Sequence, residues 1–281
     1  MVYCLKRLFA AEAAPTGRRL ARIMITNRRK RYFYLLTVLA SLVVVLGLAE
    51  IILSFSSMSR SDNRGAMAQR WLLENWHPVN ELGYRDVSLH SKNINSARVF
   101  FLGDSFTAGH GVTFEDTYYW KTVTRMLSVI EGYNISMNGF STRDQRAEFV
   151  YFTSTAQVYP DVVVHQYFGN DIQDYISPLE IGTTGSLEAW LRKSELVDFV
   201  LGGLESREQG LEYTERLVDA YNNEDVFSRH KNDLTLLHDY VRSYGAKVVF
   251  VLFPSLYGSS ASHLLNGAYV DKVRSHFLAT C

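Results

Sequence analysis

The sequence predicts an α/β fold with a parallel β-sheet, preceded by one transmembrane helix. Short apolar runs of the kind found in strands buried on both sheet faces alternate with helical patterns, which is typical of βαβ units. An uncharged run of eighteen residues near the N-terminus indicates the membrane helix. The 281 residues are 47% hydrophobic and 21% charged, which excludes a disordered chain, a collagen and a disulfide scaffold.

The N-terminal part has the pattern of a single-pass membrane anchor. Residues 1–31 form a basic tail with nine Lys/Arg and one acid, and residues 32–55 form the predicted transmembrane helix. Twenty-four helical residues span roughly 36 Å, enough to cross a hydrocarbon core of about 30 Å. The positive-inside rule places the tail in the cytoplasm and everything after residue 56 in the periplasm, with the helix in the inner membrane.

Two other structures have similar apolar runs, a buried core helix and a cleaved signal peptide. The run is unusually long for a signal peptide, and no small-x-small cleavage site follows it cleanly. Residues 56–281 carry 20 basic and 27 acidic residues, a net charge of −7. Because phosphate contacts need clustered Lys/Arg, this balance argues against nucleic acid as the main partner. Cys4 and Cys281 lie at opposite ends, with no zinc spacing and no expected disulfide.

The remaining chain divides into a juxtamembrane linker, residues 56–95, and a domain, residues 96–281. A short helix is expected within the linker at Ala66–Trp76. Strands are expected at Ala97–Leu102, Tyr133–Met137, Asp161–Phe168 and Ala246–Phe253. Helices are expected at Tyr118–Ile130, Arg143–Gln157, Phe227–Tyr244 and Ser262–Ala279. The stretch of about 175–225 contains no strand pattern and predicts a helical insertion above the sheet.

Three polar loops follow three successive strands. They contain Gly103-Asp104-Ser105, Asn138-Gly139 and Gly169-Asn170-Asp171. Because ligands bind at the carboxyl ends of parallel strands, these loops should meet in one crevice. A serine nucleophile there needs donors for an oxyanion, and the Ser105 and Gly139 N–H groups and the Asn170 amide can supply them.

Two histidines lie near this crevice in the sequence, and we expect different roles for them. His110 follows Ser105 on the same loop, and we expect it to line the pocket and contact substrate. His165 lies within the third strand, where a buried core histidine is expected.

These blocks resemble the SGNH hydrolases, also called GDSL-type esterases and lipases. The similarity covers about residues 97–254 and rests on Gly103–Ser105, Asn134–Gly139 and Phe168–Asp171. The last block departs slightly, because Gly169 directly precedes Asn170. The "GND" form is similar to a branch of membrane-tethered bacterial proteins associated with cell-surface polysaccharides. The resemblance implies a three-layer α/β/α, flavodoxin-like sandwich with no metal or other cofactor. It also implies that Ser105 is the nucleophile, with Gly139 and Asn170 in the oxyanion hole.

The general base of this family comes from a D-x-x-H block after a fifth strand, and the sequence contains no such block. The pairs Asp225/His230, Asp233/His238 and Asp271/His276 are each five residues apart. We expect the last two pairs to be solvated helix residues. His263 reads as a loop or helix-start residue. We also expect the chain to be truncated, lacking the fifth strand and the base, and therefore poorly active.

The sequence thus predicts a membrane-anchored, extracytoplasmic serine esterase that acts on carboxylic esters, with acylated glycans as one possible substrate. An O-acyltransferase of surface polysaccharide would use a sugar hydroxyl in place of water. A catalytically inactive glycan-binding or assembly factor is the alternative outside the enzymes. Activity on p-nitrophenyl acetate would separate an enzyme from a binder, and an added acceptor glycan would separate hydrolase from transferase.

Overall fold

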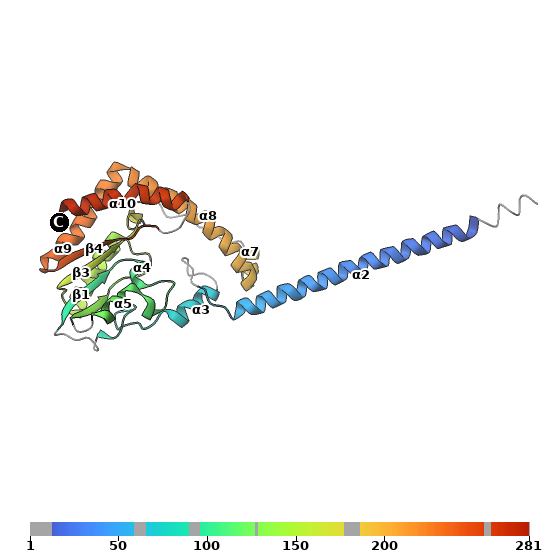
Figure 1. Ribbon diagram of the computed structural model, residues 1–281, viewed down its shortest axis with the longest axis horizontal. Coiled ribbons are helices and arrows are strands. Elements are labelled where there is room, and N and C mark those ends of the chain that lie inside the picture. Colours follow the sequence, from blue (N-terminus) through green and yellow to red (C-terminus); the bar gives the residue numbers. More distant parts are fainter. Residues whose placement is uncertain are drawn as a thin grey trace, which may run out of the picture. The chain divides into compact units, whose positions relative to one another are not determined.

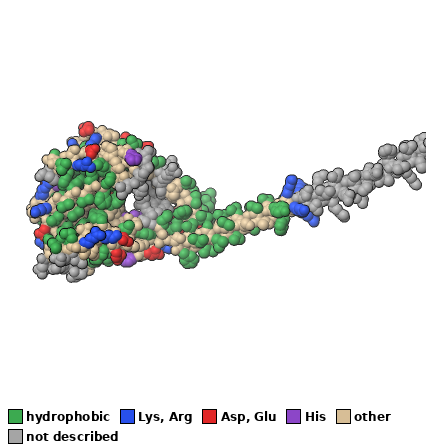
Figure 2. Space-filling model, viewed as in Figure 1, with side chains coloured by type: hydrophobic (Ala, Val, Ile, Leu, Met, Phe, Trp, Pro, Cys, Tyr) green, Lys and Arg blue, Asp and Glu red, His purple; other side chains and the backbone are tan. Residues whose placement is uncertain are grey.

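The computed structural model describes residues 13–58, 66–89, 96–126, 129–176, 186–255 and 260–280 (Figure 1). The chain divides into two compact units, Met1–Phe55 and Ser56–Cys281. The first unit contains helix α2, Ala13–Ser54. Its part from Arg28 to Ser54 is long and apolar enough to cross a membrane, a property that a signal sequence shares. Figure 2 shows hydrophobic side chains along this helix, with a Lys/Arg group at the far end of its described part.

The second unit is built on a parallel four-stranded sheet in the order β2-β1-β3-β4. The strands are β1 (Ala97–Leu102), β2 (Ile130–Asn134), β3 (Val162–Tyr167) and β4 (Lys247–Leu252). All three pairings are parallel, with Phe101 opposite Asn134 and Leu102 opposite His165. The predicted parallel α/β architecture is therefore confirmed. The carboxyl ends of β1, β2 and β3 lie along one edge of the sheet.

Helices cover both faces of this sheet. The described helices of this unit are α3 (Ala66–Asn75), α4 (Ser105–Ala108), α5 (Tyr118–Arg125), α6 (Thr142–Ala156), α7 (Ser186–Leu191), α8 (Glu195–Asn222), α9 (Glu224–Ser243) and α10 (Ser260–Thr280). Short 3-10 turns η2 (Phe114–Asp116) and η3 (Gln173–Tyr175) precede α5 and follow β3. The region of about 175–225 thus contains α7 and α8 where it is described.

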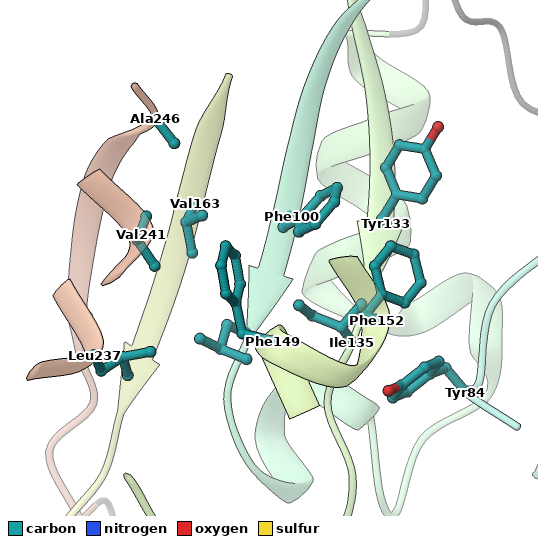
Figure 3. Close-up of a cluster of buried hydrophobic side chains, with 11 residues drawn as sticks. Tyr84, Phe100, Tyr133, Ile135, Phe149, Phe152, Val163, Leu237, Val241 and Ala246 are labelled. Atoms are coloured by element: carbon teal, nitrogen blue, oxygen red, sulfur yellow. The ribbon is translucent and has the colours of Figure 1, made fainter. Parts of the chain in front are cut away.

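Alternation along β1 sends its side chains into two cores. Phe100 and Leu102 pack with Phe149 and Phe152 of α6 and with Leu237 of α9 (Figure 3). On the opposite face, Val99 and Phe101 pack with Tyr119 and Val123 of α5. A third cluster joins β3 to α8, α9 and α10 through Tyr167, Tyr221, Leu234 and Tyr269. Strands buried on both faces explain the continuous apolar runs of the sequence.

Three boundaries differ from the prediction. The second strand runs from Ile130 to Asn134 instead of Tyr133 to Met137, because its pairing with β1 begins at Ala97 opposite Ile130. Helix α5 ends at Arg125, well before Ile130, which belongs to the strand. Much of the expected linker 56–95 is folded onto the second unit: Met67, Trp71 and Tyr84 are buried.

Candidate active site

The turn after β1 presents Ser105 at the start of α4. Asp104 caps this helix by accepting a hydrogen bond of 3.0 Å from the Phe106 N–H. Gly109 ends the helix in the left-handed conformation, at a φ of 78° that favours glycine. Gly103 is needed for packing, because a Cβ there would overlap the Thr107 hydroxyl and the Gln166 amide. The result is a sharp strand-to-helix turn with Ser105 only half-buried.

The loop after β3 is connected to this turn. Gln166, at 0% exposure near the end of β3, accepts hydrogen bonds at Oε1 from the Asp104 N–H at 3.1 Å and from the Thr107 hydroxyl at 2.9 Å. Asn170 lies close enough to Asp104 for its side-chain amide to lower the pKa of that carboxyl. The Asn170 side chain therefore lies beside the residue that directly precedes Ser105. Its Oδ1 is buried and has no hydrogen-bond partner among the residues that the structure describes.

The loop after β2 contacts both of the other two loops. Asn138 Nδ2 lies 2.8 Å from Nδ1 of His110, which connects this loop to the one that carries Ser105. On its other side, Gln173 Nε2 donates to the Gly139 carbonyl at 2.5 Å, and the Thr142 N–H donates to the Asp171 carbonyl at 3.3 Å. Gly139 is exposed, has a φ of 78°, and has open space around the position of a Cβ. Each of the three loops is thus connected to the other two.

Two of the residues in these loops, Asp104 and Asp171, have buried carboxyl groups. Burial raises the pKa of Asp104 to about 6, in spite of the hydrogen bond from the Phe106 N–H and the nearby polar side chains of Asn170 and Gln166, which favour the charged form. Burial, and then the charge of Asp104, raises the pKa of Asp171 well above its ordinary range. Asp171 holds its own turn by accepting from the Phe168 N–H at 2.6 Å, and it also accepts from the Gln145 amide. Asp171 therefore fixes the turn that presents Asn170.

The sequence did not reveal the role of Arg85. This side chain is fully buried, and its guanidinium donates to the carbonyls of Ala108 at 3.1 Å and Gly109 at 2.5 Å. It also donates to the carbonyls of Val112 at 2.8 Å and Asn75 at 2.7 Å. Arg85 thus fastens the loop after Ser105 to the end of α3. The segment's polar composition suggested a linker, and no local pattern marks one arginine in it as buried.

The structure separates the histidines into two groups. His110 is half-buried, with its ring beside Trp71 and Trp76 at centroid distances of 5.1 and 6.3 Å. His165 is buried, as predicted, with Nδ1 2.8 Å from Nε2 of His238. Burial lowers the pKa of His165 well below its ordinary value. Among the described residues, no hydrogen bond joins the Ser105 hydroxyl to a histidine.

The expectation for Asp233 and His238 is wrong, because both are buried. They lie on the face of α9 that packs against the sheet and α6. Burial lowers the pKa of His238 to about 4, helped by the nearby charges of Arg242 and His276. His230, on the same helix, is buried against the Tyr167 hydroxyl at 2.7 Å. Asp271 is exposed as expected, whereas His276 is half-buried.

In the part of the chain that the structure describes, no three His, Cys, Asp or Glu side chains are grouped so that they could hold a metal ion. The arrangement offers instead one hydroxyl, one side-chain amide and backbone N–H groups at the edge of a parallel sheet. Such a set is suited to stabilising negative charge on an oxygen atom.

Comparison with solved structures finds esterases and lipases. The psychrotrophic esterase EstA from Pseudoalteromonas sp. is 12% identical, with 65% of this chain and 74% of that chain covered and a TM-score of 0.34. A lipase/acylhydrolase from Enterococcus faecalis is 16% identical, with 64% and 73% covered and a TM-score of 0.33. AlinE4, an SGNH-hydrolase family esterase, is 17% identical, with 64% and 96% covered and a TM-score of 0.29.

No family model and no curated protein matches the chain. The three solved structures named above are described as two esterases and a lipase/acylhydrolase. Similarity of this degree does not assign an activity, which has to be argued from the three loops themselves.

Proposed function

We propose that this protein is a serine hydrolase of carboxylic esters with Ser105 as its nucleophile. The observation that carries the proposal is the mutual connection of the three loops at the carboxyl edge of the sheet. Asn138 contacts His110, Gln173 donates to the Gly139 carbonyl, and Asn170 lies beside Asp104. These contacts support one crevice in which Ser105, Gly139 and Asn170 face a common substrate.

The proposed reaction is acyl transfer to Ser105 and then to water. The Ser105 oxygen attacks the ester carbonyl carbon, and the carbonyl oxygen becomes an oxyanion held by the Ser105 and Gly139 N–H groups and the Asn170 amide. Collapse of this intermediate expels the alcohol and leaves an acyl-serine. Water then attacks the acyl-serine, releasing the carboxylic acid and regenerating the Ser105 hydroxyl.

The serine proton needs an acceptor, since the hydroxyl is neutral at pH 7. His165 does not suit this role, because it is buried against His238. His110 is carried by the loop that follows Ser105, so it is the first histidine to test. Within the described part of the chain, Asn138 Oδ1 is buried without a hydrogen-bond partner. Turning the amide would let this oxygen accept from the His110 Nδ1–H. The imidazole would then be in the tautomer whose Nε2 accepts a proton.

The proposal also places the second unit outside the cytoplasm. The basic tail and the apolar helix support an inner-membrane anchor with a cytoplasmic N-terminus. Acylated surface glycans are the substrate class that the sequence resemblance favours. A reporter that is active only outside the cytoplasm, fused after residue 90, should be active. Activity confined to a cytoplasmic reporter would contradict this topology.

The activity is tested with p-nitrophenyl acetate and the full chain in detergent micelles. Ser105→Ala should reduce turnover to the uncatalysed background. Asn170→Ala should lower kcat by roughly 10²–10³-fold, the usual effect of losing one oxyanion donor. Matched controls are Ser154→Ala and Asn232→Ala, at exposed positions on α6 and α9, which should keep full activity. Ester turnover that survives Ser105→Ala in a folded protein would overturn the proposal.

A further inference from the structure

Helix α7 and the first part of α8 lie away from the sheet (Figure 1). They carry an exposed apolar surface. We call it the apolar α7–α8 surface; it comprises Leu187, Trp190, Leu191, Phe199, Val200 and Leu204. Leu187, Trp190 and Leu204 keep 68%, 63% and 64% of their surface exposed. Residues three or four apart share one side of a helix, so Leu187 adjoins Trp190 and Val200 adjoins Leu204.

The C-terminal end of α8 is buried, in contrast to its exposed N-terminal end. Leu217, Ala220 and Tyr221 are buried in the cluster shared with α9 and α10. The helix is therefore anchored in the core by its C-terminal half, while its N-terminal half presents apolar side chains outward. Grouped exposed apolar residues usually mark a surface for a partner or a membrane, and tryptophan is enriched where proteins meet the membrane interface.

The acidic side chains that the structure describes near this surface do not oppose its contact with lipid. Three acidic side chains described along this stretch are engaged in ion pairs. Glu195 pairs with Arg70 at 3.1 Å, and Arg192 pairs with Asp198 at 3.6 Å and with Glu205. Pairing keeps these carboxylates from repelling an anionic membrane surface.

The same ion pair locates the surface relative to the start of the second unit. Arg70 Nε donates to the Ser56 carbonyl at 2.8 Å, while its Nη1 donates to Glu195, the first residue of α8. Ser56 is the residue at which the chain enters this unit, directly after Phe55. If the apolar helix spans the membrane, the start of α8 therefore lies close to the point where the chain leaves the bilayer.

We infer that the apolar α7–α8 surface docks on the membrane that holds the protein's own N-terminal helix, a deduction that rests on the proposed membrane anchor. The occupant is the interfacial layer of that bilayer, into which Leu187, Trp190 and Leu204 insert. Docking also orients the candidate site. Tyr213 of α8 donates to Gln173 at 2.7 Å, and Gln173 donates to the Gly139 carbonyl. The docked helix is thus connected directly to the loop of the site.

The test uses the full chain in nanodiscs and a fluorescent label on single cysteines. Cys4 and Cys281 are first replaced by serine, and Leu187→Cys or Leu204→Cys then carries an NBD group. Leu264→Cys and Leu278→Cys are matched controls, because these leucines of α10 are 62% and 70% exposed. Lipids with a nitroxide just below the headgroups should quench the label at Leu187 or Leu204 about threefold more than the controls, as expected for interfacial insertion.

Equal quenching at all four positions would overturn the inference. Labels at Leu187 and Leu204 that become shielded from aqueous quenchers but not quenched by lipid would mean that protein, such as a second copy, covers the surface, and would also overturn it. A label at Val43→Cys, within the apolar helix, distinguishes the proposed membrane anchor from the proposed docking of the apolar α7–α8 surface. If that label is quenched and the label at Leu187 is not, the anchor stands and docking is wrong. If neither is quenched, both membrane proposals fail. The readout is independent of esterase activity.

Discussion

Replacing Arg85 should loosen the loop that carries Ser105. Its guanidinium holds four carbonyl oxygens, of which those of Ala108 and Gly109 belong to buried residues of this loop. Burial lowers the pKa of Arg85 to about 10, so the group remains charged at pH 7. Arg85→Met removes all four donors at once. The buried Ala108 carbonyl then loses its hydrogen bond from Arg85, and the Gly109 carbonyl is left with a long one of 3.4 Å from the Val112 N–H.

The expected loss is about 3–5 kcal/mol, the range for breaking a buried charged group's contacts by removing one partner. In a unit of this size, that corresponds to a fall in melting temperature of about 6–20 °C. Arg85→Lys should lose less, since an ammonium keeps the charge but not the planar set of donors. Arg242→Met is the control: Arg242 is on the surface and pairs only loosely with Asp239 at 3.5 Å, so the expected change is at most about 0.5 kcal/mol.

The assay combines thermal unfolding of the full chain in detergent micelles with hydrogen exchange of the peptide that covers residues 105–112. Arg85→Met should lower the melting temperature and speed exchange in that peptide, and kcat should fall with it. A variant that melts with the wild type and keeps its exchange protection would refute the reasoning, because the four hydrogen bonds would then contribute nothing measurable.

Three further predictions concern buried residues. Burial lowers the pKa of His238 in the folded state to about 4, below its ordinary 6.5. As pH falls through this interval, the free energy of unfolding of the wild type should therefore fall by up to about 3 kcal/mol relative to that of His238→Gln, measured by chemical denaturation. The pH dependence of Asp104 has the opposite sign: burial raises its folded pKa to about 6, above its ordinary 3.8, so the wild type should lose stability relative to Asp104→Asn as pH rises from 3.8 to 6. Parallel pH profiles of wild type and variant would contradict either prediction. Gly103→Ala should unfold at lower temperature and lose ester turnover, because its Cβ overlaps Thr107 and Gln166; an unchanged melting curve and rate would show that the turn adjusts without cost.

Much of the fold could be predicted because its strands are buried on both faces. The bounds of the first strand agree with the prediction, since Val99–Leu102 is a continuous apolar run bounded by Gly103. The second strand was shifted by three residues. Its sequence, IEGYN, contains a charge and a glycine, and only pairing with β1 makes it a strand. Pairing over long sequence separations has no local pattern.

The loops of the candidate site could be predicted for a related reason. The carboxyl ends of neighbouring parallel strands always share an edge, so Ser105, Gly139 and Asn170 could be grouped from strand positions alone. The residues that support these loops and the sheet from elsewhere in the chain could not be predicted from the sequence. Arg85 acts from a polar segment outside the sheet, and His238 meets His165 across 73 residues. A histidine on a helix looks solvated until the helix face that is buried is known.

The central claim is that Ser105, Gly139 and Asn170 form one oxyanion-binding site. The most direct measurement is a crystal structure of the protein after reaction with a p-nitrophenyl phosphonate, whose adduct mimics the tetrahedral intermediate. The account predicts phosphorus bonded to the Ser105 oxygen, with one phosphonyl oxygen about 3 Å from the Ser105 N–H, the Gly139 N–H and the Asn170 amide. Phosphorus on another residue, or an Asn170 side chain that points away from the adduct, would contradict it.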